Sequence, residues 1–516
     1  MTYPSVDDRD LLPALGTGRL LCAAADLGAE SGRVFLGAFD GARVSLSEAS
    51  RFANEPVDTP DGLCWDTSAL LSGVAHALAE TVANGESIIS VGVDAWGVDF
   101  ALIDDAGTQL GLPRNYRDAS GEAGLADVLG RFSASELYDL TGVQLMAINT
   151  LFQLAVRRGD PDRAHAKRLL LIPDLINYLL TGEQRAEQTI ASTTQMIELA
   201  TGDWSPALCE HLGLQSDLLA PVVSPGETLG RLRSDVAASM SLPDDLIVCT
   251  VASHDTASAV VGTPLSGAGS AFISSGTWSL VGVEIDEPVV SLEACELNFG
   301  NERGFGGKTR FLRNVMGLWL LQECRRAWRL ERDDASYQML ADLAAAEPEA
   351  GPVIDPDWPE FLRRGNMPEL IREACARTDQ AVPRSRGSIA RCILESLACK
   401  YRLRIDQLEA LTGERIETIH IVGGGSGNGL LCQLTADASG RDVVAGPAEA
   451  AAVGNILVQL HAHGELGSLA EMREITSRSF RSRRYTPRAG RSDLYERFLE
   501  VVAKRDSTNI EITLES

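Results

Sequence analysis

An aspartate at the end of an apolar run is the residue of this sequence best placed to do chemistry. The apolar and β-branched residues 246–252 stop at Ser253-His254-Asp255, and small residues at helical spacing follow. This pattern predicts a buried strand that leads into the first turn of a helix. Open α/β sheets bind ligands outside the carboxyl ends of their strands, where Asp255 could accept the proton of a substrate hydroxyl. The alternative is that Asp255 or Ser253 only caps the helix.

A second candidate lies in a glycine-containing turn near the amino terminus. The apolar residues 20–25 and the alternating residues 34–39 flank this turn, which predicts a strand on each side of it. Gly28 and Gly32 allow main-chain N–H groups to converge on a phosphate, with Arg33 as a counter-charge. An ordinary β-hairpin is the alternative.

The same pattern of strand, turn and strand occurs again in the second half of the chain. Residues 271–284 again consist of a strand, a turn of small residues around Gly276 and Thr277, and a strand. Two such hairpins, each opening a mixed α/β half, predict a duplicated architecture with a cleft between the halves. A nucleotide held by both turns would bridge this cleft.

A cluster of glycines at residues 423–429 follows a predicted strand and precedes a predicted helix. Glycines at such a position permit close approach of the backbone to a flat ligand such as an adenine ring. The βαβ context of a dinucleotide fingerprint and the lysine of a Walker motif are both missing from this segment. Neither a Rossmann site nor a P-loop therefore fits it.

A tryptophan–glycine turn is another candidate. Residues 88–103 predict a strand, a turn at Trp96-Gly97 and a second strand. If Asp94 and Asp99 are exposed on either side of this turn, they could bind a polyol that stacks on the Trp96 ring. The alternative is a core tryptophan beside a tight turn.

The elements that position these motifs follow from apolar periodicity and end signals. Ser133-x-x-Glu136 is a capping box, and Pro173 suits the first turn of a helix after the strand at residues 169–172. The proline- and acid-containing residues 347–386 are expected to form an irregular insertion. Further helices are predicted at residues 67–83, 315–328, 389–411 (with Gly413 as its stop) and 448–460.

Composition and charge narrow the range of functions. At 516 residues the chain is expected to form two domains or more, and its apolar fraction of 45% is that of a globular protein. A formal net charge of −26 argues against nucleic acid or an anionic membrane as the main partner, because phosphate groups attract surfaces rich in Lys and Arg. No segment is long and uncharged enough to span a bilayer.

The cysteines indicate reduced thiols, and the amino terminus does not resemble a signal peptide, so we expect a cytoplasmic protein. The histidines do not predict a metal site. The 10 cysteines are scattered without a C-x-x-C pair. His461 and His463 lie two apart on a predicted helix, so they point to different sides and do not predict a zinc site. Asp7, Asp8 and Asp10 stand where a signal peptide would carry positive charge.

Taken together, these segments resemble the FGGY family of carbohydrate kinases, within the superfamily of actin, hexokinase and Hsp70-like proteins. The resemblance extends from about residue 20 to residue 487. It implies an α/β fold of two duplicated ribonuclease H-like domains with a nucleotide and sugar cleft between them. The implied boundaries are a flexible lead-in at 1–18, an amino-terminal domain at 19–256, a carboxyl-terminal domain at 257–490, and a helix and tail at 491–516.

Three stretches resemble most closely the branch of the family that phosphorylates L-rhamnulose. They are residues 92–100 with Gly111-Leu112-Pro113 and Tyr116-Arg117-Asp118, residues 252–260, and residues 274–280. The implied reaction is ATP-dependent phosphorylation of L-rhamnulose at the 1-hydroxyl, giving L-rhamnulose 1-phosphate and ADP in L-rhamnose catabolism. The alternatives are a kinase for another ketose such as L-fuculose, and a nucleotide-dependent switch or filament protein on the same fold.

The resemblance also implies roles for individual residues. Asp255 matches the family's proton acceptor, and Asp26 matches the acid that helps to hold Mg²⁺, commonly through water. An acid beside phosphates would repel them, so the Glu30 side chain is expected to point away. The implied ATP contacts are Ala29, Glu30, Ser31, Gly32, Arg33, Thr277, Gln322 and Gly424. The implied sugar contacts are Gly97, His254, Asp255, Thr256 and Asn314.

The implied partners are ATP, Mg²⁺ and a small ketose, with no nucleic acid and no membrane. The protein is expected to be a monomer or a weak homo-oligomer. Some members of this family carry a cysteine pair in the helix after the glycine cluster, whereas Thr435 and Ser439 stand at the matching positions here. No disulfide is therefore implied at those positions.

Overall fold

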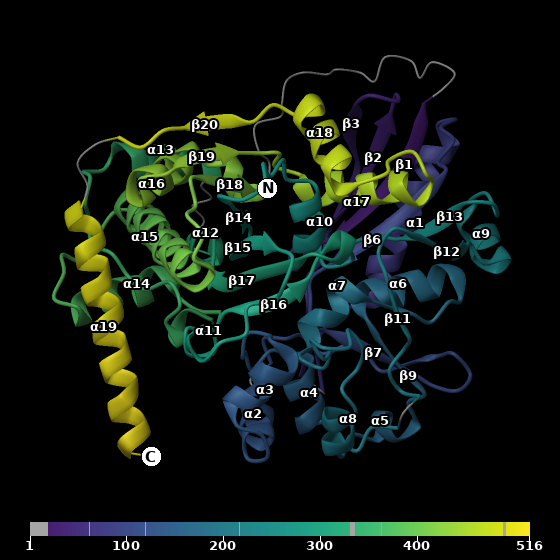
Figure 1. The fold of residues 1–516 in the computed structure, drawn as a ribbon, viewed down its shortest axis with the longest axis horizontal. Helices are drawn as coiled ribbons and strands as arrows, with labels where there is room; N and C mark the ends of the chain where they lie inside the picture. Colours follow the sequence, from purple (N-terminus) through teal and green to yellow (C-terminus); the bar gives the residue numbers. More distant parts are fainter. Residues whose placement is uncertain are drawn as a thin grey trace.

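Two large β-sheets, one in each half of the chain, form the centre of the molecule (Figure 1). The computed structural model describes residues 19–515 apart from Asp61, Ala119, Ser216, residues 331–335, Arg363 and residues 489–491. The lead-in expected at residues 1–18 lies outside the described residues. Helices pack against both sheets, so the α/β class predicted from the sequence is confirmed.

The amino-terminal sheet has six strands. They are β1 (Leu20–Leu27), β2 (Ser31–Phe39), β3 (Val44–Ala53), β6 (Ser90–Ala95), β12 (Glu227–Arg231) and β13 (Ile247–Thr250). Their order across the sheet is β12-β13-β6-β1-β2-β3. The first three strands form an antiparallel meander, β6 and β13 run parallel to β1, and β12 closes the edge antiparallel to β13.

The carboxyl-terminal sheet repeats this plan. Its seven strands are β14 (Ser270–Ser275), β15 (Trp278–Ile285), β16 (Gly300–Arg303), β17 (Thr309–Met316), β18 (Thr418–Val422), β19 (Asp442–Ala445) and β20 (Arg483–Tyr485). The order is β16-β17-β15-β14-β18-β19-β20, and β14, β18 and β19 are the parallel strands. Without β16, the succession of antiparallel and parallel pairings matches that of the first sheet. The predicted duplication is therefore confirmed.

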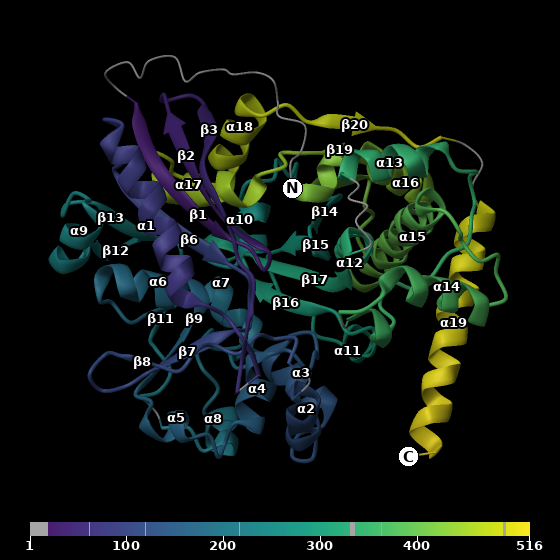
Figure 2. The same ribbon diagram turned by 180° about the vertical axis from the view of Figure 1, so that it is seen from behind.

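Helices and three small sheets surround these two sheets (Figures 1 and 2). The small sheets contain β4 (Val57–Thr59) with β5 (Gly62–Cys64), β7 (Phe100–Ile103) with β8 (Gln109–Leu110) and β9 (Arg168–Leu171), and β10 (Ala186–Glu187) with β11 (Val222–Val223). The first half has helices α1 (Thr67–Ala83), α2 (Gly121–Leu129), α3 (Ala134–Thr141), α4 (Thr150–Val156), α5 (Pro161–His165), α6 (Ile172–Thr181), α7 (Gln188–Ala191), α8 (Pro206–Leu212), α9 (Ser234–Met240) and α10 (Asp255–Val261). The second half has α11 (Leu292–Glu296), α12 (Trp319–Leu330), α13 (Tyr337–Ala346), α14 (Met367–Arg377), α15 (Arg386–Thr412), α16 (Gly429–Ser439), α17 (Ala450–Ala462), α18 (Leu469–Ser479) and α19 (Ser492–Glu515). Short 3₁₀ turns are η1 (Ser192–Thr194), η2 (Phe305–Gly307), η3 (Pro359–Leu362) and η4 (Gly424–Gly427).

Local end signals predicted several helix boundaries. Ser133 and Glu136 form the capping box of α3, and Pro173 lies in the first turn of α6. Gly413 ends α15 with a φ of 72°, a left-handed conformation that glycine adopts without steric cost. These predictions are confirmed because a cap depends only on residues within one turn of the helix end.

Two predictions from local pattern are wrong. The helix predicted at residues 315–328 begins only at Trp319, because Met316 still pairs with Trp278 as the last residue of β17. The insertion expected at residues 347–386 contains the regular helix α14. Pro368 lies in the first turn of α14, where a proline does not remove an intrahelical hydrogen bond.

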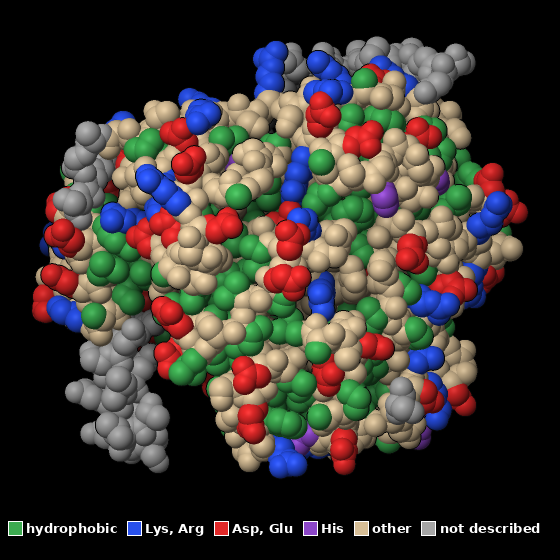
Figure 3. All heavy atoms as spheres, viewed as in Figure 1, with side chains coloured by type: hydrophobic (Ala, Val, Ile, Leu, Met, Phe, Trp, Pro, Cys, Tyr) green, Lys and Arg blue, Asp and Glu red, His purple; other side chains and the backbone are tan. Residues whose placement is uncertain are grey.

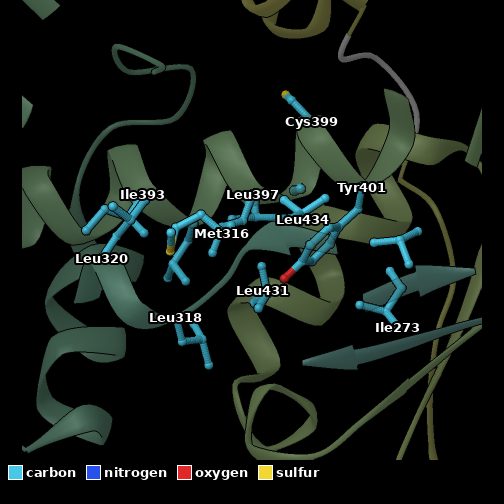
Figure 4. Packing of buried hydrophobic residues seen from close by; sticks show 14 of the residues in the cluster. Ile273, Met316, Leu318, Leu320, Ile393, Leu397, Cys399, Tyr401, Leu431 and Leu434 are labelled. Atoms are coloured by element: carbon cyan, nitrogen blue, oxygen red, sulfur yellow. The ribbon is translucent and has the colours of Figure 1, made fainter. Parts of the chain in front are cut away.

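Helix α15 passes through the core of the carboxyl-terminal half (Figure 4). Its side chains Ile393, Leu397 and Tyr401 are fully buried among residues of β14, β17 and α16. The Tyr401 hydroxyl lies 2.7 Å from Ser279 Oγ, so the polar end of this buried ring has a hydrogen-bond partner. The start of β15, directly after the hairpin turn, is thereby anchored to the largest core among the described residues.

The two halves meet where α10 crosses α17. A Cβ atom added to Gly454 of α17 would stand 1.8 Å from the carbonyl oxygen of Ser258 in α10, so the two backbones approach more closely than a side chain would allow. Helix α17 also packs on the amino-terminal sheet, where Asn455 Nδ2 donates a hydrogen bond of 2.6 Å to Asp94 Oδ2. A helix from the second half therefore helps to cover the first sheet, and it lies beside β1 in both ribbon views (Figures 1 and 2).

The surface carries mixed charge. On the face shown in Figure 3, Asp and Glu side chains are scattered among Lys and Arg side chains. All ten cysteines are free. Within the described residues, no helix combines the length and the apolarity that crossing a membrane requires.

Candidate active site

A cleft of about 360 Å³ is lined by residues of both halves. Its walls are the turns of the β1–β2 and β14–β15 hairpins, the start of α10 and the first glycines after β18. Among the site residues expected from the sequence, Gly32 alone does not line it. The residues that do are Asp26, Ala29, Glu30, Ser31, Arg33, Gly97, His254, Asp255, Thr256, Thr277, Asn314, Gln322 and Gly424.

Asp255 is the first residue of α10 and lies at the corner predicted from the sequence. Its Oδ1 accepts hydrogen bonds from the Thr256 amide at 2.5 Å and the Thr256 hydroxyl at 3.2 Å, and its side chain remains 34% exposed. Burial raises the pKa of Asp255, the nearby Asp26 carboxylate raises it further, and His254 lowers it. The result is a carboxylate at the cleft wall that binds a proton more readily than an exposed aspartate does.

His254 connects Asp255 to a buried ion pair. Its Nε2 lies 3.5 Å from Asp255 Oδ1, and its Nδ1 lies 3.1 Å from Glu302 Oε2. The fully buried Arg310 lies 3.0 Å from the same Glu302 oxygen. Burial alone would raise the pKa of Glu302, but Arg310 and His254 together hold it below its ordinary value. The imidazole is therefore held between two acids, and both of them line the cleft.

Arg33 joins the two halves across the cleft. Its guanidinium donates to Asp26 on the neighbouring strand and to Glu449 beside α17. Burial would lower the pKa of Arg33, but the two carboxylates raise it overall. Burial raises the pKa of Glu449, although Arg33 opposes this. This guanidinium is therefore cationic at the cleft wall, where an anion such as a phosphate could exchange with a carboxylate partner.

The acids beside Trp96 are not exposed, so the hypothesis that they bind a polyol is wrong. Asp94 and Asp99 are both fully buried. Asp99 Oδ2 accepts N–H groups from Trp65 at 2.6 Å and from Trp96 at 3.0 Å. Burial raises the pKa of Asp99 to about 6, and these hydrogen bonds lower it in part. The acid thus orients a tryptophan that lines the cleft, instead of contacting a ligand itself.

Asp94 adds a further acid behind the cleft. It stands next to Asp26 on the adjacent parallel strand, and its Oδ1 is buried without a hydrogen-bond partner among the described residues. Burial and the charge of Asp26 raise the pKa of Asp94 well above its ordinary value, against the hydrogen bond from Asn455. A protonated Asp94 avoids placing two carboxylate charges side by side in the core.

The glycine cluster lies against the second hairpin turn. Gly423 has a φ of 73° and lines the cleft with Gly424. A Cβ atom on Gly425 would stand 2.1 Å from Ser275 Oγ. Close approach at Gly425 therefore serves packing within the protein, whereas Gly423 and Gly424 leave backbone exposed to a ligand.

Gly32 and Glu30 differ from the other residues of the first turn. Gly32 is buried beneath Phe52, whose ring would lie 2.2 Å from an added Cβ, so packing accounts for this glycine. Glu30 is exposed at the cleft, and burial of part of its side chain raises its pKa, with Arg117 opposing and Glu323 reinforcing the shift. That the Glu30 side chain turns away from bound phosphates stays a prediction.

Several lining residues carry no local sequence signal. Gln144 Oε1 accepts both the amide and the side-chain N–H of Asn314, at 2.8 and 3.1 Å, from a position 170 residues earlier. Glu302 belongs to β16, in a segment with no recognisable motif. The others in this group are Tyr116, Met146, Asn149 and Thr193. Only the fold brings them to the cleft.

The cleft therefore combines an acid that can accept a proton, a cationic guanidinium and exposed backbone of two turns. These groups suit transfer of an anionic group to a hydroxyl, because they offer a base for the hydroxyl and donors for the anion. Among the described residues, no group of three or more His, Cys, Asp or Glu side chains is arranged to hold a metal ion.

Family models match both halves of the chain. The model for the amino-terminal domain of the FGGY family of carbohydrate kinases matches residues 21–262, and that for the carboxyl-terminal domain matches residues 271–463. The chain is 42% identical to a rhamnulokinase of Bacteroides thetaiotaomicron, over 90% of this chain and 95% of that protein. It is 37% identical to a rhamnulokinase of Bacillus subtilis, over 94% of this chain and 99% of that protein.

Solved structures share the fold at low identity. A xylulose kinase from Lactobacillus acidophilus superimposes with a TM-score of 0.77 at 14% identity, covering 96% of this chain and 100% of that one. The Plasmodium falciparum glycerol kinase with ADP superimposes with a TM-score of 0.72 at 15% identity, covering 96% and 98%. At these identities the likeness shows the fold alone.

Proposed function

Since the chain belongs to the FGGY family of carbohydrate kinases, we propose that it uses ATP to phosphorylate L-rhamnulose at the 1-hydroxyl. The products are L-rhamnulose 1-phosphate and ADP. The observation that carries the proposal is the position of Asp255, a partly exposed acid at a cleft lined by both hairpin turns. The choice of sugar is supported by the rhamnulokinases that are similar over nearly the whole chain.

The two substrates take opposite sides of Asp255 in this proposal. The sugar contacts Gly97, His254, Thr256 and Asn314. ATP contacts the first turn through Ala29, Glu30, Ser31 and Arg33, and the second half through Thr277, Gln322 and Gly424. Gly32, which the resemblance also gave as an ATP contact, is buried under Phe52, so its part would be to allow the turn to pack closely on that ring rather than to touch the nucleotide.

In the chemical step Asp255 accepts the proton of the 1-hydroxyl while that oxygen attacks the γ-phosphorus. A bond forms between the sugar oxygen and phosphorus, and the bond from phosphorus to the β–γ bridging oxygen breaks. Backbone N–H groups of the two turns and the Arg33 guanidinium stabilise the charge on the transferred group. Positioning supplies most of the acceleration, since phosphoryl transfer needs little covalent work from the protein.

The acidic side chains of the cleft fit Mg²⁺. Magnesium prefers oxygen ligands, keeps several waters, and binds through one or two carboxylates together with substrate phosphates. Asp26 is such a carboxylate at the cleft wall, and we propose that it holds the ion through water. The ion would supply positive charge next to the transferred phosphate.

The direct test is coupled ADP release with a panel of ketoses. With L-rhamnulose, we expect a kcat/KM that exceeds that for L-fuculose by about 10-fold or more, because a single unmatched hydroxyl changes selectivity by that much. A higher kcat/KM for L-fuculose would assign the cleft to the other sugar. ATP turnover without any sugar, or polymerisation on adding ATP, would favour a switch or filament protein.

The pH dependence of the reaction is a second test. A base must be ionised, and burial raises the pKa of Asp255, so activity should be lost on acidification at a higher pH than for an exposed aspartate. We expect kcat/KM for the sugar, measured at saturating ATP, to fall on the acid side well above about pH 4. A profile that stays flat down to that pH, while circular dichroism shows the protein folded, would contradict this role for Asp255.

A further inference from the structure

Two side chains behind the cleft hold the main chain that carries Asp255. Glu187 is the last residue of β10 and Thr189 lies in α7, and both are almost completely buried. Neither lines the cleft. They belong to the part of the amino-terminal half that lies between β9 and β12, far in sequence from α10.

Glu187 accepts hydrogen bonds from two directions. Three come from its own helix: the Thr189 amide at 2.9 Å, the Thr189 hydroxyl at 2.5 Å and the Ile190 amide at 3.2 Å. The fourth comes from the Ser253 amide at 3.0 Å, across 66 residues of sequence. A carboxylate that only capped α7 would not need this fourth donor.

Thr189 continues the contact by one residue. Its hydroxyl donates to Glu187 and accepts the His254 amide at 3.2 Å. The amides of Ser253 and His254, directly before Asp255, are therefore both held by side chains of this one segment. The opposite face of the corner is held by Ala95, whose amide donates to the Ser253 carbonyl oxygen at 2.8 Å.

Other restraints on this corner include the Ala95 amide and the contact of the His254 side chain with Glu302. Helix α10 has only seven residues, and the His254 side chain at its amino-terminal cap makes no capping hydrogen bond. One side-chain oxygen of Asp255, Oδ1, accepts the Thr256 amide and hydroxyl. The direction of the other oxygen therefore depends on the position of the backbone. Losing an acceptor for a buried amide is costly, and the backbone would shift to find another partner.

We propose that Glu187 and Thr189 are positioning residues for catalysis, which fix the main chain at Ser253 and His254 so that Asp255 faces the acceptor hydroxyl. The inference rests on the proposed kinase function, because it assigns these residues to the step in which Asp255 acts. A displacement of a reacting group by about 1 Å can lower a rate by about 100-fold. The predicted ATP contacts lie on other elements, so the effect should appear in kcat and not in the KM for ATP.

The test compares Thr189→Val with Thr189→Ser and with the control Thr194→Val. Valine keeps the shape of threonine but accepts no hydrogen bond, whereas serine keeps the hydroxyl. Thr194 is equally buried, and among the described residues its hydroxyl bonds only within its own segment, to the Ala191 carbonyl oxygen and the Met196 amide. We expect Thr189→Val to lower kcat by about 10- to 100-fold with the KM for ATP changed less than about 2-fold. Thr189→Ser should stay within about 3-fold of wild type, and Thr194→Val should leave kcat nearly unchanged.

Amide hydrogen exchange supplies a readout that does not depend on activity. Peptides that span residues 250–258 should exchange faster in Thr189→Val than in Thr194→Val, since only the first variant frees the His254 amide. If Thr189→Val does not fold, Glu187→Gln takes its place in the test, because it keeps the side-chain shape. This variant should speed the same exchange and lower kcat.

Two results would overturn the inference while leaving the kinase function intact. One is a folded Thr189→Val variant with wild-type kcat. The other is an equal loss of kcat in Thr189→Val and Thr194→Val, which would reduce the role to stability. Wild-type protein that phosphorylates no ketose would overturn the proposed function and this inference together.

Discussion

Replacing Asp255 with asparagine is expected to lower kcat by about 10²- to 10⁴-fold, the contribution of a general base. Asparagine has nearly the shape of aspartate, and its side-chain oxygen can still accept the Thr256 amide. It cannot take the proton of the sugar hydroxyl. ATP affinity should change little, because Asp255 lies on α10 while the predicted ATP contacts lie on the hairpin turns and beyond. Coupled ADP release measures kcat, and isothermal titration measures ATP binding.

The melting temperature distinguishes the loss of the base in Asp255→Asn from unfolding of the variant. Because the folded-state pKa of Asp255 is raised, the protonated form is the one that the fold favours. That contribution to stability is present below the unfolded-state pKa and is lost as the pH rises through the raised folded-state pKa. At pH 7 the neutral asparagine should therefore melt at the same temperature as aspartate or higher.

A matched control is available on the surface. Asp286 has a side chain that is 82% exposed and pairs only with Lys308 among the described residues, so Asp286→Asn should leave both kcat and melting unchanged. An Asp255→Asn variant that keeps kcat within about 10-fold of wild type would remove Asp255 from the role of base.

Gly454→Ala is expected to destabilise the protein by about 3 kcal/mol, at the upper end of the cost of overpacking. Intrinsic helix propensity alone would predict the opposite sign, because alanine stabilises a helix interior by about 1 kcal/mol relative to glycine. The steric term decides the outcome, since the added Cβ would stand 1.8 Å from the Ser258 carbonyl oxygen and 2.7 Å from its carbon. Backbone atoms cannot rotate away, so α10 must separate from α17.

The variant should also lose activity, because α10 begins with Asp255. Urea unfolding followed by circular dichroism measures the stability, and coupled ADP release at a temperature where the variant stays folded measures kcat. Gly159→Ala is the control, since no described atom outside its chain neighbours lies within 4 Å of a Cβ built there, and its free energy of unfolding should change by less than about 0.5 kcal/mol. Equal unfolding midpoints for Gly454→Ala and wild type would show that the two helices can part without cost.

The crossing of α10 and α17 explains why the cleft depends on the whole chain. Helix α17 carries Asn455, which donates to Asp94, and it follows Glu449, which pairs with Arg33. Helix α10, which begins with Asp255, packs on α17 at Ser258 and Gly454, so the acid at its start and the guanidinium of β2 are both tied to the same helix of the second half. A change in the packing of α17 is therefore expected to alter the positions of both Asp255 and Arg33 in the cleft.

Much of the fold could be predicted from the sequence. Strand, glycine-containing turn and strand near residues 20–39 and 271–284 predicted the two hairpins that open the sheets, and both form as predicted. The abrupt end of an apolar run at Ser253 predicted the corner before α10. Capping residues and a helix-ending glycine predicted the ends of α3 and α15. Each of these signals is local, because strand alternation, helix periodicity and caps depend on residues within a few positions.

Burial was the first property that local pattern did not determine. Asp94 and Asp99 stand in a strand-turn pattern that allows either exposure or burial, and tertiary packing, including that of α17 and of Trp65 against them, excludes water. The end of β17 depended in the same way on its pairing with β15. A residue's own neighbours in sequence cannot report which other strand or helix will cover it.

The candidate site also contains residues that the sequence predicts and contacts that only the tertiary structure brings together. The residue types of the two turns and of Ser253-His254-Asp255 were determined by the sequence, because each motif spans a single strand end. The partners that hold them were decided by the tertiary structure: Glu302 for His254, Glu187 for Ser253, and Glu449 for Arg33. These pairs are separated by dozens to hundreds of residues, so their contacts follow from the packing of two duplicated sheets around one cleft and not from any periodicity along the chain.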